Sequence, residues 1–300
     1  MSMHADQLAV TVETVRRLVD EQFPDWARLP LERLNGEGTV NAIFKLGERL
    51  SARLPLRPAP VDTIRQTLRS EADAARMLAG QTRFATPQTV ALGEPGVGYP
   101  LPWSVQTWLP GITATLADPG TSLGFAHDLA EFVASVRAID TDGRTFTGSG
   151  RGGDLRSHDN WMEECLGHSV GLFDVGRVRQ LWRRLRELPR SSPDVMTHGD
   201  LTPGNVLVSA DRLTGVLDVA GLGPADPALD LVGGWHLLEA GPRQVFRDDL
   251  ECADFEWERG KAWALEQTSG AVWYYATTNP AMHRMGVRTI DRILADDTTP

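Results

Sequence analysis

The hydrophobic pattern changes near residue 110, and this change constrains the fold more than any other feature of the sequence. Before it, short apolar runs alternate with glycine and proline, which predicts several strands and a single helix among them. After Leu109-Pro110-Gly111, apolar residues recur at helical spacing. Strands followed by a run of helices are typical of an α+β fold. We expect the strands at residues 40–46, 50–56, 88–92 and 103–108, and the helix at 62–79.

The proline-glycine pair at residues 110–111 predicts a hinge around residues 105–111, between two lobes. Residues 1–108 are expected to form a small antiparallel-sheet lobe that opens with a helix at 5–22, and residues 109–300 a mainly helical lobe. One strand hairpin interrupts the second lobe, at 205–208 and 213–219. The helices of that lobe are expected at 125–139, 161–167, 178–188, 229–240, 244–252, 257–275 and 290–295.

Composition restricts the classes of partner. The 300 residues are 41% hydrophobic and 23% charged, which is ordinary for a globular protein. No apolar run approaches the ~20 residues that span a bilayer, and the N-terminus lacks a secretory pattern, so no membrane partner is expected. Two cysteines far apart, Cys165 and Cys252, indicate free thiols in a cytoplasmic protein. A net charge of −10 without a basic cluster argues against a nucleic-acid partner and suits a cationic ligand.

The motif that carries chemistry runs from His198 to Asn205, and Asp218 follows thirteen residues later. Phosphoryl transfer requires a carboxylate that orients the incoming hydroxyl and accepts its proton, and Asp200 can do this. Mg²⁺ takes hard oxygen ligands, which Asn205 and Asp218 supply. The two lie at opposite ends of the expected hairpin, and Pro203-Gly204 forces a tight loop after Asp200. The joint pattern therefore predicts a site for Mg²⁺ and a nucleoside triphosphate, ATP or GTP.

The segment His198-Gly199-Asp200-Leu201-Thr202-Pro203-Gly204-Asn205 resembles the catalytic loop of protein kinases. With glycine after the histidine and Val216-Leu217-Asp218 following, it is similar to the aminoglycoside phosphotransferase family, which includes macrolide kinases and is similar to choline and homoserine kinases. The resemblance implies a protein-kinase-like two-lobe fold, with nucleotide bound in lobe 1–108 and the acceptor in lobe 109–300. It also implies that Asp230 holds the catalytic loop through backbone hydrogen bonds. His198 has no second His or Cys at metal-ligand spacing, so we expect it to pack as a structural residue that shapes the loop.

In a kinase-like fold, a cation on the third strand grips the phosphates and a helix glutamate holds that cation. Arg53 stands at the strand position, and Glu71 in the following helix is its expected partner. Lysine is commoner there, but the guanidinium fork also binds phosphate well. Lys45, on the preceding strand, is the alternative cation.

Two further nucleotide contacts are expected in the first lobe. Gly36 and Gly38 belong to a loop whose exposed N–H groups could cradle phosphates, although a plain turn fits the same residues. Gln106 and Trp108 stand where the resemblance places the adenine-binding segment, and their backbone groups are the expected contacts.

The acceptor pocket is predicted from charge and from the resemblance, which implies that helices after Asp218 line it. Residues 226–258 carry nine acidic residues and two arginines, with tryptophans nearby. Such a pocket would attract an amine by charge and cation–π contact, although solvated helix faces and core tryptophans explain the same residues. We therefore expect a small, cationic acceptor, an aminoglycoside or alternatively a macrolide. The expected substrate-binding residues are Trp235, Glu239, Asp248, Asp249, Glu256 and Trp273.

Other activities fit the same motif. A metabolic kinase of choline, homoserine or a sugar would use the same mechanism. A nucleotide-binding relative without catalysis is a second alternative, against which the complete set Asp200, Asn205 and Asp218 argues. A protein kinase is a third, and the short stretch between Asp218 and Asp226 leaves no room for a long activation segment.

Overall fold

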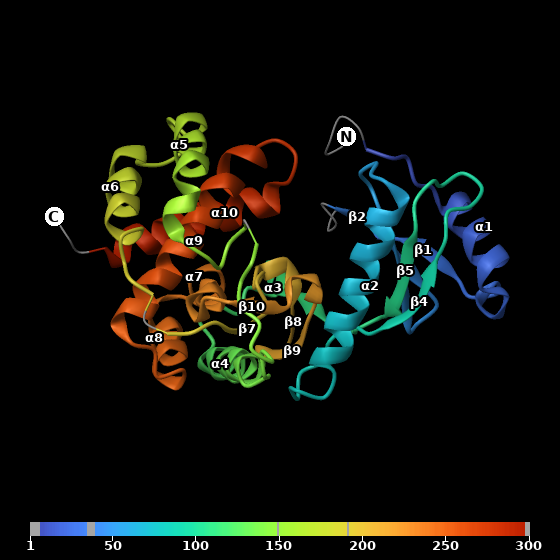
Figure 1. The fold of residues 1–300 in the computed structure, drawn as a ribbon, viewed down its shortest axis with the longest axis horizontal. Coiled ribbons are helices and arrows are strands. Elements are labelled where there is room, and N and C mark those ends of the chain that lie inside the picture. Colours follow the sequence, from blue (N-terminus) through green and yellow to red (C-terminus); the bar gives the residue numbers. More distant parts are fainter. Residues whose placement is uncertain (1–6, 35–39, 149, 191, 298–300) are drawn as a thin grey trace. The chain divides into compact units, whose positions relative to one another are not determined.

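The computed structural model describes residues 7–34, 40–148, 150–190 and 192–297. The chain divides into two compact units. Unit 1 comprises residues 1–79 and 85–110, and unit 2 comprises residues 80–84 and 111–300. Figure 1 draws unit 1 in blue to green and unit 2 largely in green to red. Nucleotide binding by the first lobe and acceptor binding by the second stay predictions.

Unit 1 is built on one antiparallel sheet with the strand order β1-β2-β3-β5-β4. Strand β2 shows why the sheet forms, because Ala42, Phe44 and Leu46 alternate with more exposed residues and enter the core. Gly47, at a φ of +62°, supports the tight turn into β3. The strands are β1 (Leu31–Arg33), β2 (Asn41–Leu46), β3 (Leu50–Pro55), β4 (Thr89–Gly93) and β5 (Trp103–Thr107).

Two helices complete unit 1. Helix α1 (Val12–Gln22) begins where the Thr11 hydroxyl accepts a hydrogen bond from the Thr14 N–H at 3.2 Å. Its residues Val15, Leu18 and Val19 are buried in the core together with the sheet's inward side chains. Helix α2 (Val61–Leu78) packs against β4 and β5.

Unit 2 is mainly helical and is organised around α9, whose side chains are buried almost all round. Helix α9 contacts α5, α6, α7 and α10. Figure 1 shows α7, α9 and α10 in orange to red, with α5 and α6 in yellow-green beside them. The helices are α3 (Ala114–Ala117), α4 (Leu123–Arg137), α5 (Asp159–His168), α6 (Val175–Leu185), α7 (Val232–Leu237), α8 (Ala240–Asp249), α9 (Asp254–Tyr274) and α10 (Pro280–Asp296).

Two small antiparallel sheets interrupt these helices. Strands β6 (Ile112–Thr113), β8 (Val206–Ser209) and β9 (Arg212–Val216) form one, in the order β6-β8-β9. Strands β7 (Val195–Thr197) and β10 (Gly223–Ala225) form the other. Strands β7 and β10 flank the segment from His198 to Asp218, and the β8–β9 hairpin lies within it, so the two sheets position this segment.

The structure confirms the predicted antiparallel-sheet region followed by a helical region. Strands β2 to β5 and the β8–β9 hairpin lie within a few residues of their predicted bounds. The predicted helix 5–22 begins only at Val12, and residues 5 and 6 of that prediction lie outside the described residues. The predicted helix 290–295 is the end of the longer α10, which begins after the N-cap Asn279. Among the described residues, no helix is long and apolar enough to cross a membrane.

Candidate active site

Asp200 and Asn205 are brought together by the tight loop that joins them. The Asn205 amide Nδ2 donates to Asp200 Oδ2 at 2.8 Å and to the Asp200 carbonyl oxygen at 3.0 Å. Two backbone bonds close the loop, from Thr202 N to Asp200 O (2.9 Å) and from Asn205 N to Thr202 O (3.0 Å). Because the amide nitrogen of Asn205 faces the carboxylate, its side-chain oxygen points the other way and is available as a ligand.

His198 is fully buried and connects the catalytic loop to the hairpin. Its Nδ1 accepts from the Asp200 N–H at 3.3 Å, and its Nε2 lies 3.1 Å from the Leu217 carbonyl oxygen, to which it donates. Phe132 meets the imidazole edge to face, with ring centroids 5.9 Å apart. These contacts fix the backbone of Asp200 relative to the end of β9.

Asp230 holds the backbone of the same loop. It is completely buried, and its two carboxylate oxygens accept from the His198 N–H (2.7 Å) and the Gly199 N–H (2.8 Å). Burial raises the pKa of this carboxyl, while the hydrogen bonds from the two backbone donors oppose that shift. Asp230 therefore satisfies two buried donors of the loop without contact to solvent.

Asp218 lies two residues after the end of β9, at the other end of the hairpin from Asn205. The Leu217 N–H donates to the Asn205 carbonyl oxygen at 2.7 Å, so the residue before Asp218 is tied to Asn205. Asp218 has a φ of +56°, in the left-handed region that a residue with a Cβ adopts at a cost. Such conformations cluster at functional sites.

Two glycines allow the catalytic loop to approach the segment after Asp218. Gly199 has a φ of +83° and lies against Gly221, where a Cβ would meet the Gly221 carbonyl oxygen at 3.2 Å. A Cβ on Gly221 would meet the His198 carbonyl oxygen at 2.7 Å, which no side chain tolerates. The approach of the two backbones therefore requires glycine at 221.

Two residues that the sequence did not single out contact Asp200. Gln267 on α9 donates from Nε2 to Asp200 Oδ1 at 2.8 Å, and Arg151 places Nη2 3.5 Å from the same oxygen. The position of Gln267 could have pointed to it, because it is an amide within the almost wholly buried helix α9, where a polar side chain needs a hydrogen-bond partner. Arg151 lies in a glycine- and arginine-rich loop that gave no signal of its own.

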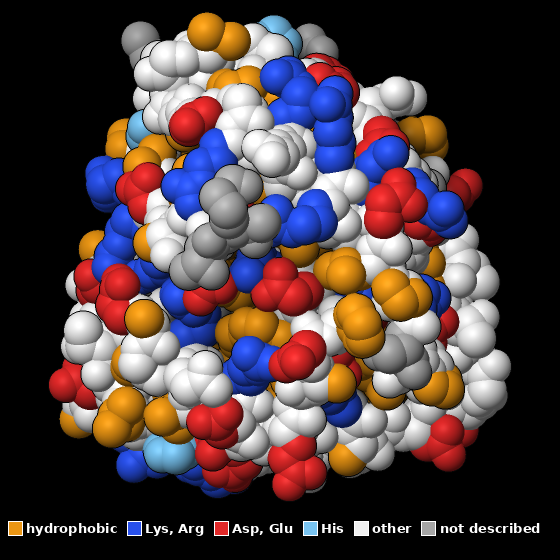
Figure 2. Space-filling view, turned by 90° about the vertical axis from the view of Figure 1, so that its left-hand side faces the viewer, with side chains coloured by type: hydrophobic (Ala, Val, Ile, Leu, Met, Phe, Trp, Pro, Cys, Tyr) orange, Lys and Arg blue, Asp and Glu red, His pale blue; other side chains and the backbone are white. Residues whose placement is uncertain are grey.

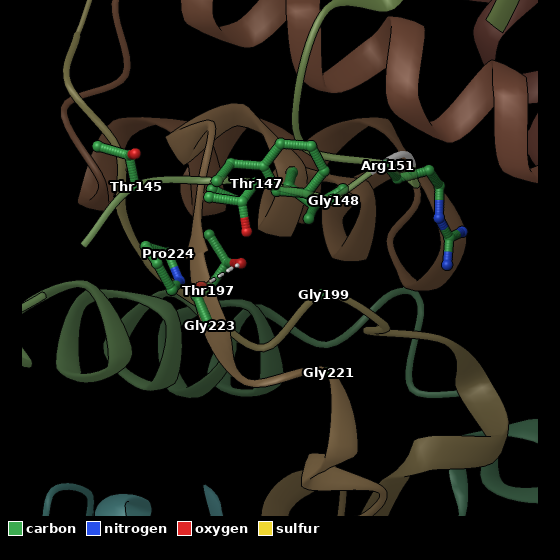
Figure 3. A pocket seen from close by; sticks show the side chains of 12 residues that line it. Thr145, Thr147, Gly148, Arg151, Thr197, Gly199, Gly221, Gly223 and Pro224 are labelled. Atoms are coloured by element: carbon green, nitrogen blue, oxygen red, sulfur yellow. Dashed lines mark hydrogen bonds between the residues drawn. The ribbon is translucent and has the colours of Figure 1, made fainter. Parts of the chain in front are cut away.

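A cavity of about 330 Å³ opens beside the catalytic loop, within unit 2. It lies between the 145–151 segment and the β7–β10 sheet, and Figure 3 shows Thr145 and Thr147 across from Thr197, with Arg151 at one edge near Gly199. The Thr197 hydroxyl donates to the Gly223 carbonyl oxygen at 3.1 Å. The lining residues are Thr145, Phe146, Thr147, Gly148, Arg151, Thr197, Gly199, Gly221, Gly223, Pro224, Ala225 and Leu229.

The predicted nucleotide contacts lie in unit 1. Arg53 on β3 donates from Nη1 to the side-chain oxygen of Gln106 at 3.1 Å, across the β3–β5 pair. The Trp108 N–H donates to the Arg49 carbonyl oxygen at 2.8 Å. The alternative cation, Lys45, pairs with Glu48 at 3.0 Å and lies 5.7 Å from the Trp108 ring centroid.

Three further residues of the first lobe were predicted as nucleotide contacts. Glu71 lies on α2, in the helix that packs against β4 and β5, and its pairing with Arg53 stays a prediction. Gly36 and Gly38 lie outside the described residues.

The predicted acceptor residues are not gathered at one place, and none of them lines the cavity. Trp235 is fully buried under Arg243 and Lys261, so its indole offers no surface to a ligand. Trp273 stacks on the His168 ring, with centroids 4.3 Å apart.

The predicted acidic residues have local partners instead. Glu239 accepts from Arg292 at 2.6 Å, which lowers the pKa of its carboxyl. Glu256 accepts from Arg137 at 2.8 Å. Asp248 accepts from Gln244 at 2.7 Å, and Asp249 lies 2.5 Å from Nδ1 of His127. The arginines offset the charges of Glu239 and Glu256, and the roles of all four acidic residues in acceptor binding stay predictions.

The donor set at the loop and hairpin suits a magnesium ion that also takes ligands from phosphate. Within the described ranges, no group of three His, Cys, Asp or Glu side chains could hold a metal by itself. Mg²⁺ in nucleotide sites typically takes one or two protein carboxylates and completes its shell with phosphates and water. The outward-facing oxygen of Asn205 and the carboxylate of Asp218 fit that requirement.

Comparison with known proteins decides the family. A sequence model of the phosphotransferase enzyme family matches residues 32–263, which span the described sheet of unit 1, the catalytic loop and the first half of α9. The chain belongs to the phosphotransferase enzyme family. It is 39% identical over 143 residues to an aminoglycoside 3′-phosphotransferase from Escherichia coli, and 40% identical over 79 residues to one from Streptomyces fradiae.

These curated matches are partial. The first covers 45% of this phosphotransferase and 52% of its relative, so the chain matches about half the length of that protein. The second covers 23% of this chain and 30% of the relative.

Solved structures share the fold over nearly the whole chain. The GDP complex of an aminoglycoside 2′-phosphotransferase aligns with a TM-score of 0.68 at 18% identity, covering 96% of this chain and all of that one. A macrolide 2′-phosphotransferase from Brachybacterium faecium aligns with a TM-score of 0.61 at 18% identity, covering 93% and 97%. The predicted protein-kinase-like α+β fold and the resemblance to this family are both confirmed.

Proposed function

We propose that this phosphotransferase moves the γ-phosphate of ATP or GTP to a hydroxyl of an amine-bearing antibiotic, an aminoglycoside or a macrolide. The observation that carries the proposal is the clamped pair Asp200–Asn205, whose backbone is held by His198 and Asp230. Aminoglycoside 3′-phosphotransferases are the curated relatives, and solved relatives of the same fold are described with GDP, kanamycin, streptomycin and gentamicin.

Asp200 is assigned the role of general base. Its carboxylate orients the acceptor hydroxyl and takes its proton as the oxygen bonds to the γ-phosphorus. The bond from that phosphorus to the bridging oxygen breaks, and the nucleoside diphosphate leaves. The carboxylate is partly exposed, with 38% of its side-chain surface accessible, so an acceptor can reach it.

Mg²⁺, when bound, neutralises the charge on the phosphates. Asn205 and Asp218 would hold it. In unit 1, Arg53, Glu71 and the backbone of Gln106 and Trp108 are the proposed nucleotide contacts, because they lie on or beside the β3–β5 pair.

The cavity beside Gly199 is the proposed place of the acceptor. It is lined by three threonines and Phe146, which suits a hydroxylated ring by hydrogen bonding and apolar contact. The amines of a cationic acceptor would then lie outside this cavity, toward the acidic side chains of unit 2. Figure 2 shows acidic side chains interspersed with basic ones on one face of the molecule.

The test is a phosphate-transfer assay with ATP and GTP against kanamycin, gentamicin, streptomycin, a macrolide, choline and homoserine. Asp200→Ala should lower kcat for the best acceptor by about 10²–10⁴-fold, the usual contribution of a general base, and leave nucleotide binding intact. Asp291→Ala, which removes an exposed carboxylate from α10, is the matched control and should keep wild-type kcat.

Two outcomes would contradict the proposal. Near-normal kcat in Asp200→Ala would remove the general base from the mechanism. Turnover of choline or homoserine alone would assign the chain to metabolism instead of antibiotic modification.

A further inference from the structure

A chain of three hydrogen-bonded side chains ends at the Asp200 carboxylate. Gln267 Nε2 donates to Asp200 Oδ1 at 2.8 Å, and Gln267 Oε1 lies 3.0 Å from Nε2 of His236. The Nδ1 atom of His236 lies 3.2 Å from the Thr289 hydroxyl. Helices α9, α7 and α10 supply these residues, and the three helices pack against one another in unit 2 (Figure 1).

Each bond in this chain fixes the direction of the next. A carboxylate only accepts, so the Gln267 amide must turn its nitrogen to Asp200 and its oxygen to His236. His236 is 3% exposed, and burial lowers its pKa to about 4, so the ring is neutral and carries one N–H. That proton must lie on Nε2 to serve Gln267, which leaves Nδ1 to accept from the Thr289 hydroxyl.

The two oxygens of Asp200 are therefore held from two elements. Asn205, in the catalytic loop itself, donates to Oδ2, and Gln267, on α9, donates to Oδ1. The loop bond alone would leave the carboxylate free to swing about χ1 with Asn205. The second bond ties it to a helix whose own position is set by the core of unit 2.

We propose that Gln267 is a positioning residue for phosphoryl transfer, and that His236 and Thr289 fix its amide so that the Asp200 carboxylate keeps one orientation toward the acceptor hydroxyl. This inference rests on the proposed function, in which Asp200 is the base. Gln267 touches neither nucleotide nor acceptor in this role and acts through Asp200 alone.

The first test is Gln267→Met, which keeps the side-chain length and removes both amide hydrogen bonds. A misplaced base should lower kcat by about 10²-fold, with the KM for ATP unchanged within about two-fold. Gln22→Met is the matched control, because it removes two hydrogen bonds to the Glu94 backbone from a glutamine in unit 1. That control should keep wild-type kcat.

Thr289→Val gives a second, milder variant if Gln267→Met folds poorly. It removes only the distant hydroxyl at nearly constant volume and should lower kcat by a few-fold, because His236 then loses the partner that fixes its tautomer.

A double-mutant cycle separates positioning from general stability. In an Asp200→Ala background, Gln267→Met should cause no further loss of the residual rate, because the carboxylate it positions is gone. A second loss of about 10²-fold in that background would overturn the inference, since it would show that Gln267 acts on something other than Asp200.

A crystal structure of Gln267→Met tests the inference without any acceptor. The Asp200 carboxylate should move by more than about 0.5 Å, the tolerance of catalytic geometry, or occupy two conformers. An unmoved carboxylate, or a normal kcat in Gln267→Met when Asp200→Ala is inactive, would refute the positioning role. An active Asp200→Ala would instead refute the proposed function.

Discussion

Asp200, the proposed general base, is held mainly by uncharged groups, and this matters for its chemistry. Asn205 and Gln267 each donate one amide hydrogen bond to its carboxylate at 2.8 Å, whereas the cationic Arg151 lies further away, at 3.5 Å. A close, bidentate guanidinium would compete for the oxygen lone pair that must accept the hydroxyl proton. Amide donors fix the carboxylate while leaving it a usable base.

His236 gives a residue-scale prediction about pH. Burial lowers its folded pKa to about 4, below the 6.5 of a free imidazole. Between these values the unfolded chain binds a proton that the folded chain does not, so the free energy of unfolding falls as the pH falls from 6.5 to 4. The contribution is about 3 kcal/mol, at 1.36 kcal/mol for each pH unit.

Urea denaturation of the wild type and His236→Gln between pH 7 and pH 4 measures this contribution. The variant is less stable at pH 7 but should lose less on acidification. Gln22→Met, which removes no titratable group, is the control and should keep the wild-type pH slope. Equal slopes in wild type and His236→Gln would contradict the prediction. His158 acts in the opposite sense, because its hydrogen bond to Glu266 raises its pKa.

The catalytic loop could be predicted at residue scale because its chemistry is local. Asp200 and Asn205 are five residues apart, and Pro203-Gly204 closes the loop between them. Gln267 could not be found in this way, because it reaches Asp200 from 67 residues further along the chain. Only the packing of α9 decides that its amide meets the carboxylate.

At the scale of elements, length decided which strands could be predicted. The six-residue strand β2 carries enough alternation to be recognised, and β3 could be predicted as its hairpin partner after the turn at Gly47. Strands β7 and β10 have three residues each and are defined by pairing with one another across 26 residues of chain. A three-residue strand has no periodicity of its own, so its existence depends on tertiary context.

The turn between β8 and β9 gives an element-scale prediction. Ala210 and Asp211 have φ values of +48° and +55°, the signature of a type I′ hairpin turn. A residue with a Cβ is strained there, so Ala210→Gly should raise the free energy of unfolding by about 1 kcal/mol. Because only the turn changes, the proposed metal ligands at the hairpin ends stay in place and kcat should not change.

The same substitution elsewhere is the control for this turn. Ala134→Gly, at an exposed position inside α4, should lower the free energy of unfolding by about 1 kcal/mol, since glycine weakens a helix interior. Urea denaturation of both variants gives the comparison. Destabilisation by Ala210→Gly would show that the strain at residue 210 is relieved by contacts of its methyl group.

At the scale of the whole molecule, one short segment serves several parts of the site. Residues 226–237 carry Asp230, which holds the loop backbone, and His236, which orients Gln267. At the start of this segment, Asp226 forms a buried ion pair with Arg259 of α9 at 2.5 Å. Composition predicted the acidity of this region but not its use, because a sequence cannot show which carboxylates the arginines neutralise.

The net charge of −10 gives a prediction for the whole molecule. If the acceptor is a polycation such as kanamycin, the long-range field of the protein should speed its encounter. The Debye length shrinks from about 30 Å at 0.01 M salt to about 8 Å at 0.15 M, so kcat/KM for kanamycin should fall several-fold over that range.

The anionic nucleotide provides the control in the same assay, because its kcat/KM should stay level or rise. The charges of a local ion pair such as Glu256–Arg137 lie too close together for salt to screen them in this way. Only unpaired charge therefore contributes to the salt-dependent long-range field. A salt-independent kcat/KM for kanamycin would mean that short-range contacts, not the field of the acidic chain, select the acceptor.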